Sequence, residues 1–419
     1  MFNFRQKMPK KDIRRDIFFS NMKDESILNT IISDKQMKDL ASLNVVEAVS
    51  ALLEQLNKRE QDVLKRRFGL FGEPKETLES IGGRHKLTRE RIRQIESGGV
   101  NKLKKNPELE TRLGALRQLV SQLSEEHGGL LEKNYLFKLL ANLTQAGAEG
   151  PSNIHPYFEF ALSRLLNDHF EEVGNSQYFN DFYKIKYQSL EHLEAVAQEL
   201  LDEVKKFKNL LATAELIALV KGLKSYGAQA DKFNVPGNLD LKEVMRPVTG
   251  IDTEAAHNDR VIYSLLNALA DVEQNKFGAW GHRESREVKP KTINDKIYLV
   301  LKANKKPMYY GDIAKKISEM GFDGKTVNTA TTHNELILDD KYVLVGRGLY
   351  GLREWGYKEG TVADVIAEIL KESREPLSKE AITAKVLEQR LVKQTTVNLA
   401  LMNKNRFERI KDGKYKLKD

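Results

Sequence analysis

The chain has 419 residues, and its 68 basic and 60 acidic side chains give a formal net charge of +8, which favours a partner such as nucleic acid. It contains no cysteine, which excludes disulfides and thiolate zinc sites and fits a reducing cytoplasm. No stretch approaches the roughly 18 apolar residues of a membrane span, and the basic N-terminus lacks the apolar core of a secretory signal. The length predicts roughly three to five domains.

Two segments precede the most charged part of the chain. Residues 1–44 are predicted to form a basic, helical extension. A longer amphipathic helix is expected over 56–70 because its apolar residues recur at helical spacing. The residues expected to face inward are Leu56, Val63, Leu64 and Phe68.

The next segment predicts two short helices joined by a tight turn. Thr77 can cap the first helix, and Gly82-Gly83 with the residues that follow are expected to form the turn. Thr88 can cap the second helix. Two short helices in this arrangement, the second of them basic, predict a helix-turn-helix.

The second of these helices has a divided surface. Residues 84–105 contain eight Lys or Arg and two Glu, a net charge of +6. At about 100° per residue, an apolar seam of Ile92, Ile95, Gly99 and Leu103 lies on one side. The polar side consists of Arg89, Glu90, Arg93, Gln94, Ser97 and Lys104. A solvated basic helix face is the common alternative, but arginine, glutamate and glutamine are also the side chains that pair with base edges in the major groove.

The run 56–109 contains RFGL, TLESIG and TRERIRQIE in this order, and it resembles region 4 of the sigma-70 family of bacterial initiation factors. The resemblance implies that the helix after Thr88 enters the major groove of a promoter −35 element. It also implies that the flap of the RNA polymerase β subunit docks on this domain. The residues expected to contact DNA are Lys86, Thr88, Arg89, Glu90, Arg91, Arg93, Gln94, Ser97 and Lys104.

Three features depart from the family pattern. Gly98 and Gly99 stand where the family usually continues with alanine and leucine. Each glycine costs a helix roughly 1 kcal/mol, so the C-terminal half of this helix is predicted to fray or bend. Arg84 stands where the family often has an acidic residue. The residues before the match also lack the aromatic cluster that a promoter-melting domain needs, since their aromatics are Phe2, Phe4, Phe18 and Phe19.

The remainder of the chain repeats one pattern, in which amphipathic helices precede two strand-like segments joined by a turn. Such hairpins are expected at 169–185, 269–282, 341–357 and 406–419. Helices followed by a hairpin, repeated along the chain, predict tandem winged helices. The predicted domains are the helix-turn-helix at 45–115 and winged helices at 116–188, 189–288 with an insertion at 224–257, 289–358 and 359–419.

The third copy carries a second resemblance. Residues 292–357, with the wing Gly346-Arg347-Gly348-Leu349-Tyr350-Gly351-Leu352 and then Trp355, are similar to the HARE helix-turn-helix domain. The resemblance implies a winged helix that contacts DNA or a polymerase-type partner. The chain lacks the acidic tail of polymerase delta subunits that share this module. Arg347 at the wing tip is a candidate phosphate contact. The expected core residues behind the wing are Tyr342, Leu349, Tyr350 and Trp355.

These observations predict a mainly α fold with small β-wings, in which a helix-turn-helix domain precedes tandem winged helices. The eight histidines lack metal-ligand spacing and no phosphate-binding loop or nucleophile motif is present, so we expect no metal, no cofactor and no enzymatic activity. The predicted function is duplex-DNA binding for transcription regulation with bacterial RNA polymerase, in the cytoplasm at the nucleoid. Two alternatives are a polymerase accessory subunit that grips the β flap and a specificity module beside a nuclease, and an atypical sigma factor also fits.

Overall fold

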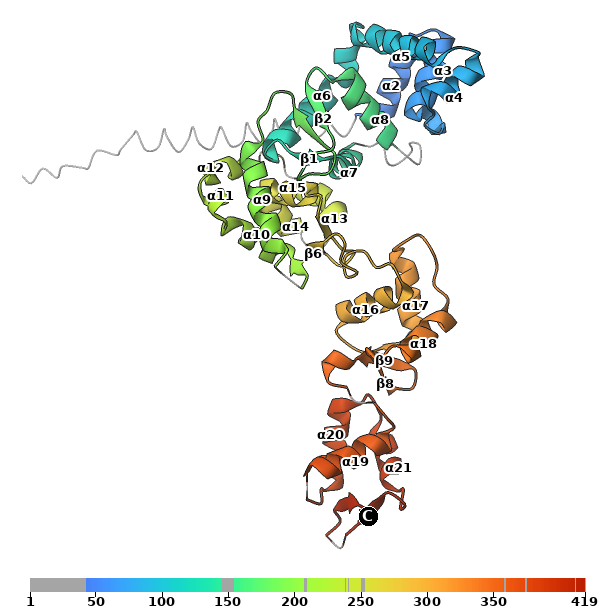
Figure 1. The fold of residues 1–419 in the computed structure, drawn as a ribbon, viewed down its shortest axis with the longest axis vertical. Coiled ribbons are helices and arrows are strands. Elements are labelled where there is room, and N and C mark those ends of the chain that lie inside the picture. Colours follow the sequence, from blue (N-terminus) through green and yellow to red (C-terminus); the bar gives the residue numbers. More distant parts are fainter. Residues whose placement is uncertain are drawn as a thin grey trace, which may run out of the picture. The chain divides into compact units, whose positions relative to one another are not determined.

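The computed structural model describes residues 43–418 except 145–153, 207–208, 238, 240, 250–252, 358, 374 and 411 (Figure 1). Almost all of the extension predicted for residues 1–44 lies outside this described part. The described residues are mainly helical and carry small antiparallel sheets, as the sequence predicts. The chain divides into two compact units, residues 1–273 and residues 274–419.

The first domain of unit 1 is entirely helical. In chain order its elements are α2 (Val45–Leu53), α3 (Lys58–Phe68), the 3-10 turn η1 (Leu70–Gly72), α4 (Leu78–His85) and α5 (Arg89–Lys104). Val63, Ile81 and Ile92, one from each of the last three helices, are fully buried against one another. This small core fixes α5 to the domain through one side only, which leaves the other side of α5 in solvent.

Both predicted caps of the helix-turn-helix are confirmed. The hydroxyl of Thr77 accepts a hydrogen bond from the Ser80 N–H at 3.2 Å, and the hydroxyl of Thr88 accepts one from the Arg91 N–H at 3.2 Å. Each bond satisfies one of the N–H groups that a helix start leaves without an intrahelical partner. The starts of α4 and α5 are therefore determined by local sequence.

The turn between α4 and α5 does not begin at Gly82-Gly83, where the sequence predicts it. Gly82 and Gly83 are inside α4, and the chain turns at Lys86, whose backbone is left-handed with φ of 55°. The Leu87 N–H donates to the Gly82 carbonyl at 2.9 Å, and a Cβ on Gly82 would lie 2.7 Å from the Leu87 carbonyl oxygen. Gly82 is therefore required for the close approach of the turn to α4 rather than for the turn itself.

The predicted fraying of α5 is also wrong. The helix is continuous from Arg89 to Lys104, and neither Gly98 nor Gly99 has positive φ. Gly99 is buried, and a Cβ there would lie 3.3 Å from Leu64 Cδ1 of α3. Packing of α5 against α3 thus outweighs the low helix propensity of the two glycines.

The rest of unit 1 forms two further helical domains with hairpins. The first contains α6 (Glu108–Glu126), β1 (Leu131–Glu132), α7 (Lys133–Leu143), α8 (His155–Phe160), the π-helical turn η3 (Ala161–Leu165), β2 (Phe170–Val173) and β3 (Phe182–Ile185), with antiparallel strand order β1-β3-β2. Helix α6 crosses the boundary predicted at residue 115, because its apolar face continues on both sides of that position.

The second of these domains includes the predicted insertion. Its elements are α9 (Glu191–Val204), β4 (Leu211–Ala212), α10 (Thr213–Lys221), α11 (Lys224–Gly227), α12 (Ala230–Phe233), α13 (Lys242–Thr249), α14 (Thr253–Asn258), α15 (Arg260–Ala268) and β5 (Val272–Gln274). Arg260 of α15 forms a buried ion pair with Glu126 of α6 and donates to the Leu239 carbonyl at 2.6 Å. This pair ties the two domains together, because a buried charge is stable only beside its partner.

Unit 2 contains two winged helices in sequence, preceded by β6 (Ala279–His282). The first has α16 (Ile293–Asn304), β7 (Met308–Tyr309), α17 (Tyr310–Met320), α18 (Thr329–Leu338), β8 (Tyr342–Gly346), β9 (Leu349–Leu352) and the 3-10 turn η5 (Arg353–Trp355), with strand order β7-β9-β8. The second has α19 (Val362–Ser373), α20 (Lys379–Gln389), α21 (Gln394–Leu401), β10 (Phe407–Arg409) and β11 (Tyr415–Leu417).

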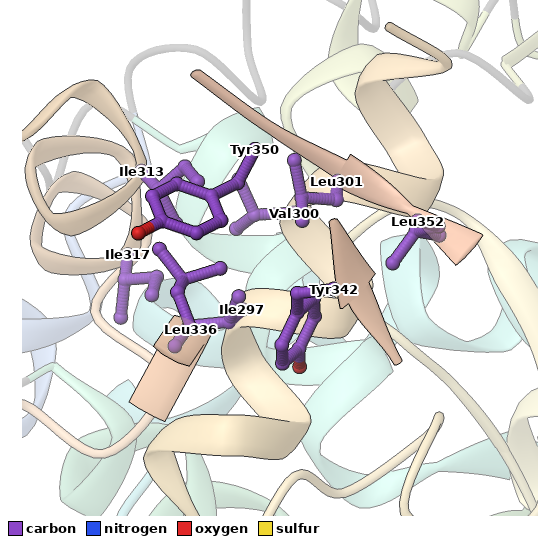
Figure 2. Packing of buried hydrophobic residues seen from close by; sticks show 9 residues of the cluster. All are labelled: Ile297, Val300, Leu301, Ile313, Ile317, Leu336, Tyr342, Tyr350 and Leu352. Carbon is purple, nitrogen blue, oxygen red and sulfur yellow. The ribbon is translucent and has the colours of Figure 1, made fainter. Parts of the chain in front are cut away.

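Figure 2 shows the core of the first winged helix of unit 2, in which α16, α17, α18 and the hairpin all contribute side chains. Tyr342 and Tyr350 are each 4% exposed and belong to this core, as the sequence predicts. Trp355 is partly buried against it, and Leu349 is also partly buried. These aromatic residues hold the wing against the helices.

Candidate nucleic-acid interface

The polar side of α5 and the turn before it face solvent. Eight of the nine residues that the sequence predicts to contact DNA in this domain are exposed: Lys86, Thr88, Arg89, Glu90, Arg91, Arg93, Gln94 and Ser97. The opposite side is held by Ile92 and Leu103, which are 0% and 1% exposed. The burial pattern thus agrees with the apolar seam predicted at helical spacing.

Within this surface, Arg93 and Glu90 pair with each other. Arg93 donates two hydrogen bonds to the Glu90 carboxylate, at 2.9 Å and 2.7 Å, and both side chains are more than half exposed. The hydrogen bond from Arg93 lowers the pKa of Glu90, and the same bond raises the pKa of Arg93. The exposed pair contributes little to stability.

A second exposed pair lies beside it. Arg91 donates to the Gln94 side-chain oxygen at 3.0 Å, one turn along the same helix. Arg89 makes no ion pair with the residues that the structure describes, and it is exposed at the first position of α5. Arg89 therefore leaves its guanidinium free for an external acceptor such as a phosphate or a guanine edge.

Lys104 differs from the other predicted contacts. Its ammonium lies 2.6 Å from Asp168 Oδ2 and donates to the Asn167 side-chain oxygen at 2.8 Å, and the side chain is only 23% exposed. The hydrogen bond from Lys104 lowers the pKa of Asp168. Lys104 is thus neutralised by the domain that follows. Sequence spacing could not reveal this, because the partner lies more than 60 residues away.

Two more basic residues of the run are tied to the helical domain itself. Arg84 lies 3.1 Å from Glu76, a carboxylate that also accepts from Arg66 and from the Ser80 hydroxyl. Lys102 lies 2.6 Å from Glu60 of α3. The basic Arg84, unusual for the family, is therefore balanced by an acidic neighbour. The charge available to DNA is concentrated in the first half of α5.

His85 closes α4 onto α3. Its Nε2 lies 2.8 Å from Asp62 Oδ2, and it is the last residue of α4. This contact joins the end of α4 to α3 and gives His85 a structural role within the domain.

The side of the domain formed by η1 and the end of α3 contacts α8, which the sequence did not predict, and Phe71 there remains 43% exposed. The rings of Phe68 and Phe160 are 4.8 Å apart, and the Phe71 N–H donates to the Tyr157 hydroxyl at 2.8 Å. Lys75 forms an ion pair with Glu159 at 2.7 Å. The Phe68 and Phe71 pair in the sequence was the signal that an apolar surface there needed a cover.

Arg347, the remaining predicted contact, belongs to unit 2. It is exposed in the turn between β8 and β9, where Gly348 has φ of 68° and allows the tight reversal. Helix α18, beside this wing, has the sequence TATTHNELIL and contains no Lys or Arg. The wing and α18 thus present far less positive charge than α5.

In the part of the chain that the structure describes, no helix is both long enough and apolar enough to span a membrane. The described residues also hold no group of three or more His, Asp or Glu side chains arranged to bind a metal ion.

The capped pair α4 and α5, with one basic exposed helix, defines a helix-turn-helix domain of the DNA-binding type. Residues 52–105 match the sigma-70, region 4 family and form a domain of that kind. The RNA polymerase sigma factor RpoD of Helicobacter pylori is 38% identical over 84 residues, which cover 20% of this chain and 12% of that protein. SigA of Lactococcus lactis subsp. cremoris is 45% identical over 58 residues, or 14% of this chain and 16% of that protein. No solved structure matches the chain significantly.

Proposed function

We propose that this chain is a DNA-binding transcription regulator that acts with RNA polymerase at the nucleoid and has no enzymatic activity. Helix α5 binds duplex DNA in the major groove at an element of the −35 type. The observation that carries the proposal is the exposed row of Arg89, Glu90, Arg93 and Gln94 on a capped helix that its core holds from behind.

The chemistry of this row suits base recognition. Arginine pairs with guanine through two hydrogen bonds, glutamine does so with adenine, and glutamate accepts from cytosine. Lys86 and Arg91 flank the row and are exposed, so they suit phosphate contacts that set the register of the helix. Because Arg93 and Glu90 are paired in the free protein, base contact by either requires the pair to open or to be shared.

The proposed polymerase contact rests on the kind of relatives that match. RpoD and SigA are RNA polymerase sigma factors, and the β flap is the proposed docking partner of residues 52–105. The resemblance of 292–357 to the HARE domain suggests a second, protein-facing contact. Support for it comes from α18, which contains no Lys or Arg and exposes Ile337 and Leu338, and so suits a protein better than duplex DNA.

Duplex binding is tested with Arg89→Ala and Arg93→Ala in the full chain. Selection of bound duplexes followed by titration at several salt concentrations measures both affinity and salt slope. A lost base contact should cost about 1–3 kcal/mol and relax specificity at one position, whereas a lost phosphate contact should weaken all duplexes alike. Unchanged binding of both variants at every salt concentration would remove α5 as the DNA-binding helix.

Two experiments separate the proposal from its alternatives. Capture of core polymerase by this protein without DNA, together with unchanged effects on transcription in the Arg89→Ala variant, would favour the accessory-subunit alternative. Permanganate footprinting with core polymerase and this protein alone tests the sigma-factor alternative. We expect no reactive thymines near the start site, because opening DNA requires several bases to be unstacked and held. Reactive thymines there would show a true sigma factor.

A further inference from the structure

A row of aromatic side chains crosses the first winged helix of unit 2. The ring of Tyr309 in β7 lies 4.4 Å from that of Tyr310, which lies 4.5 Å from His333 of α18. His333 in turn lies 5.9 Å from Tyr350 in the core. The outer ring, Tyr309, is 41% exposed, so the row begins in solvent and ends in the interior.

The Tyr309 ring lies close against two glycines, Gly311 and Gly348. A Cβ on Gly311 would lie 2.9 Å from Tyr309 Cε1, and a Cβ on Gly348 would lie 2.7 Å from Cε2. Any larger residue at either position would displace the ring.

Tyr309 also stands where a capping residue would be expected. It precedes α17 at the N-cap and makes no side-chain cap hydrogen bond. At the same place before α20, Ser378 accepts from the Ala381 N–H at 3.2 Å, and before α7, Glu132 accepts from the Tyr135 N–H at 2.7 Å. Tyrosine at this position forgoes a stabilising cap, as Ala212 does at the same place before α10.

Positive charge flanks the exposed ring along the chain. Lys305 and Lys306 precede β7, and Arg347 is next to Gly348 in the wing; all three are exposed. None of them forms an ion pair with the residues that the structure describes. A hydrogen bond with Tyr310 is the largest cause that raises the pKa of Tyr309, and the charge of Asp312, the acidic residue closest in sequence, is the smallest of the causes.

We propose that Tyr309 stacks an unpaired base of single-stranded nucleic acid while Lys306 and Arg347 bind the neighbouring phosphates. An exposed ring with cations near it along the chain is a combination that binds single strands, because every base has a π-face. Duplex DNA conceals those faces between stacked pairs, and α18, which carries Glu335 and no Lys or Arg, offers little to a duplex. The site is separate from α5, so it stands or falls independently of the proposed duplex binding.

The test uses the full chain with a fluorescent oligothymidine and a duplex that carries the preferred site of α5. Tyr309→Ser removes the ring and places a serine at the N-cap of α17, as Ser378 stands at the N-cap of α20. The melting temperature of this variant should therefore be unchanged or higher. Single-strand affinity should fall about 5- to 100-fold, the range expected for one lost stacked base, while duplex affinity stays the same. Tyr309→Phe should bind like the unmodified chain.

Tyr187→Ser is the matched control, because Tyr187 is 88% exposed in unit 1 and has the Lys186 ammonium 5.5 Å from its ring, but makes no ring contact of the kind that forms the Tyr309 row. This variant should leave single-strand binding unchanged. Cross-linking with 5-bromouracil in the oligonucleotide should label the peptide that contains Tyr309. The proposal is overturned if Tyr309→Ser binds single strands normally, if both serine variants lose affinity equally, or if single-strand and duplex binding fall together.

Discussion

Helices α5 and α18 stand at the same place in two helix-turn-helix units, and each is capped by a side chain, from Thr88 and Asn328. Their exposed faces differ. The first turns of α5 expose four charged residues, whereas the exposed residues of α18 include Ala330, Ile337 and Leu338. The fold thus places an exposed helix at the same position in both units, and the side chains on its outer face determine which partner it binds.

The inner faces of the two helices, in contrast, are similar. Ile92 of α5 and Leu336 of α18 are 0% and 1% exposed, and each packs into the core of its own domain. Truncation of either residue should therefore destabilise its domain by a similar amount, about 2–5 kcal/mol. Hydrogen exchange in the full-length Ile92→Ala and Leu336→Ala variants measures this domain by domain. A loss in only one domain would show that the cores are not equivalent.

Alanine substitutions on the outer face should weaken duplex binding in α5 and leave it unchanged in α18. Arg89→Ala with Arg93→Ala should reduce duplex affinity by about 1–3 kcal/mol per contact and flatten the salt slope. The matched change on α18, Thr329→Ala with Asn334→Ala, should leave duplex affinity within about 0.5 kcal/mol, as expected for surface changes away from an interface. Fluorescence anisotropy with one duplex serves both variants. Equal losses would mean that α18 also reads DNA.

Adding positive charge to α18 tests whether charge is what separates the two helices. Ala330→Arg with Asn334→Arg adds two cations to the exposed face of α18, one turn apart. If charge is what separates the two helices, the salt slope of nonspecific duplex binding should increase by about one per new phosphate contact. A titration across salt concentrations measures the slope. No change would indicate that shape, rather than charge, keeps α18 from DNA.

The smallest expected effect concerns the two glycines of α5. Gly98 has open space around it, so Gly98→Ala should stabilise the first domain by up to about 1 kcal/mol. Gly99 faces Leu64 at 3.3 Å, so in Gly99→Ala the contact should cancel much of that gain. Hydrogen exchange of α5 distinguishes the two single variants. Equal stabilisation by both would show that Leu64 yields easily.

Much of the helix-turn-helix could be predicted because its signals are local. Caps at Thr77 and Thr88 and the apolar seam through Ile92 depend on residues within a few positions of one another. The hairpins beginning near 169 and 341 were likewise predicted from pairs of strand-like segments on either side of turn residues. The sequence therefore determined the kind of fold and the outward side of α5.

Tertiary structure decided which of the charged and aromatic residues are available. Lys104 has the same spacing as the exposed residues of α5, yet Asp168 of another domain neutralises it. Gly82 was predicted to lie in the turn, but it lies inside α4, where the close approach of the Leu87 carbonyl requires a glycine. Tyr309 gains its place in an aromatic row only when α18 packs beside the wing. The reason is the same in each case: the deciding contact comes from residues that only folding brings near, so no local pattern contains it.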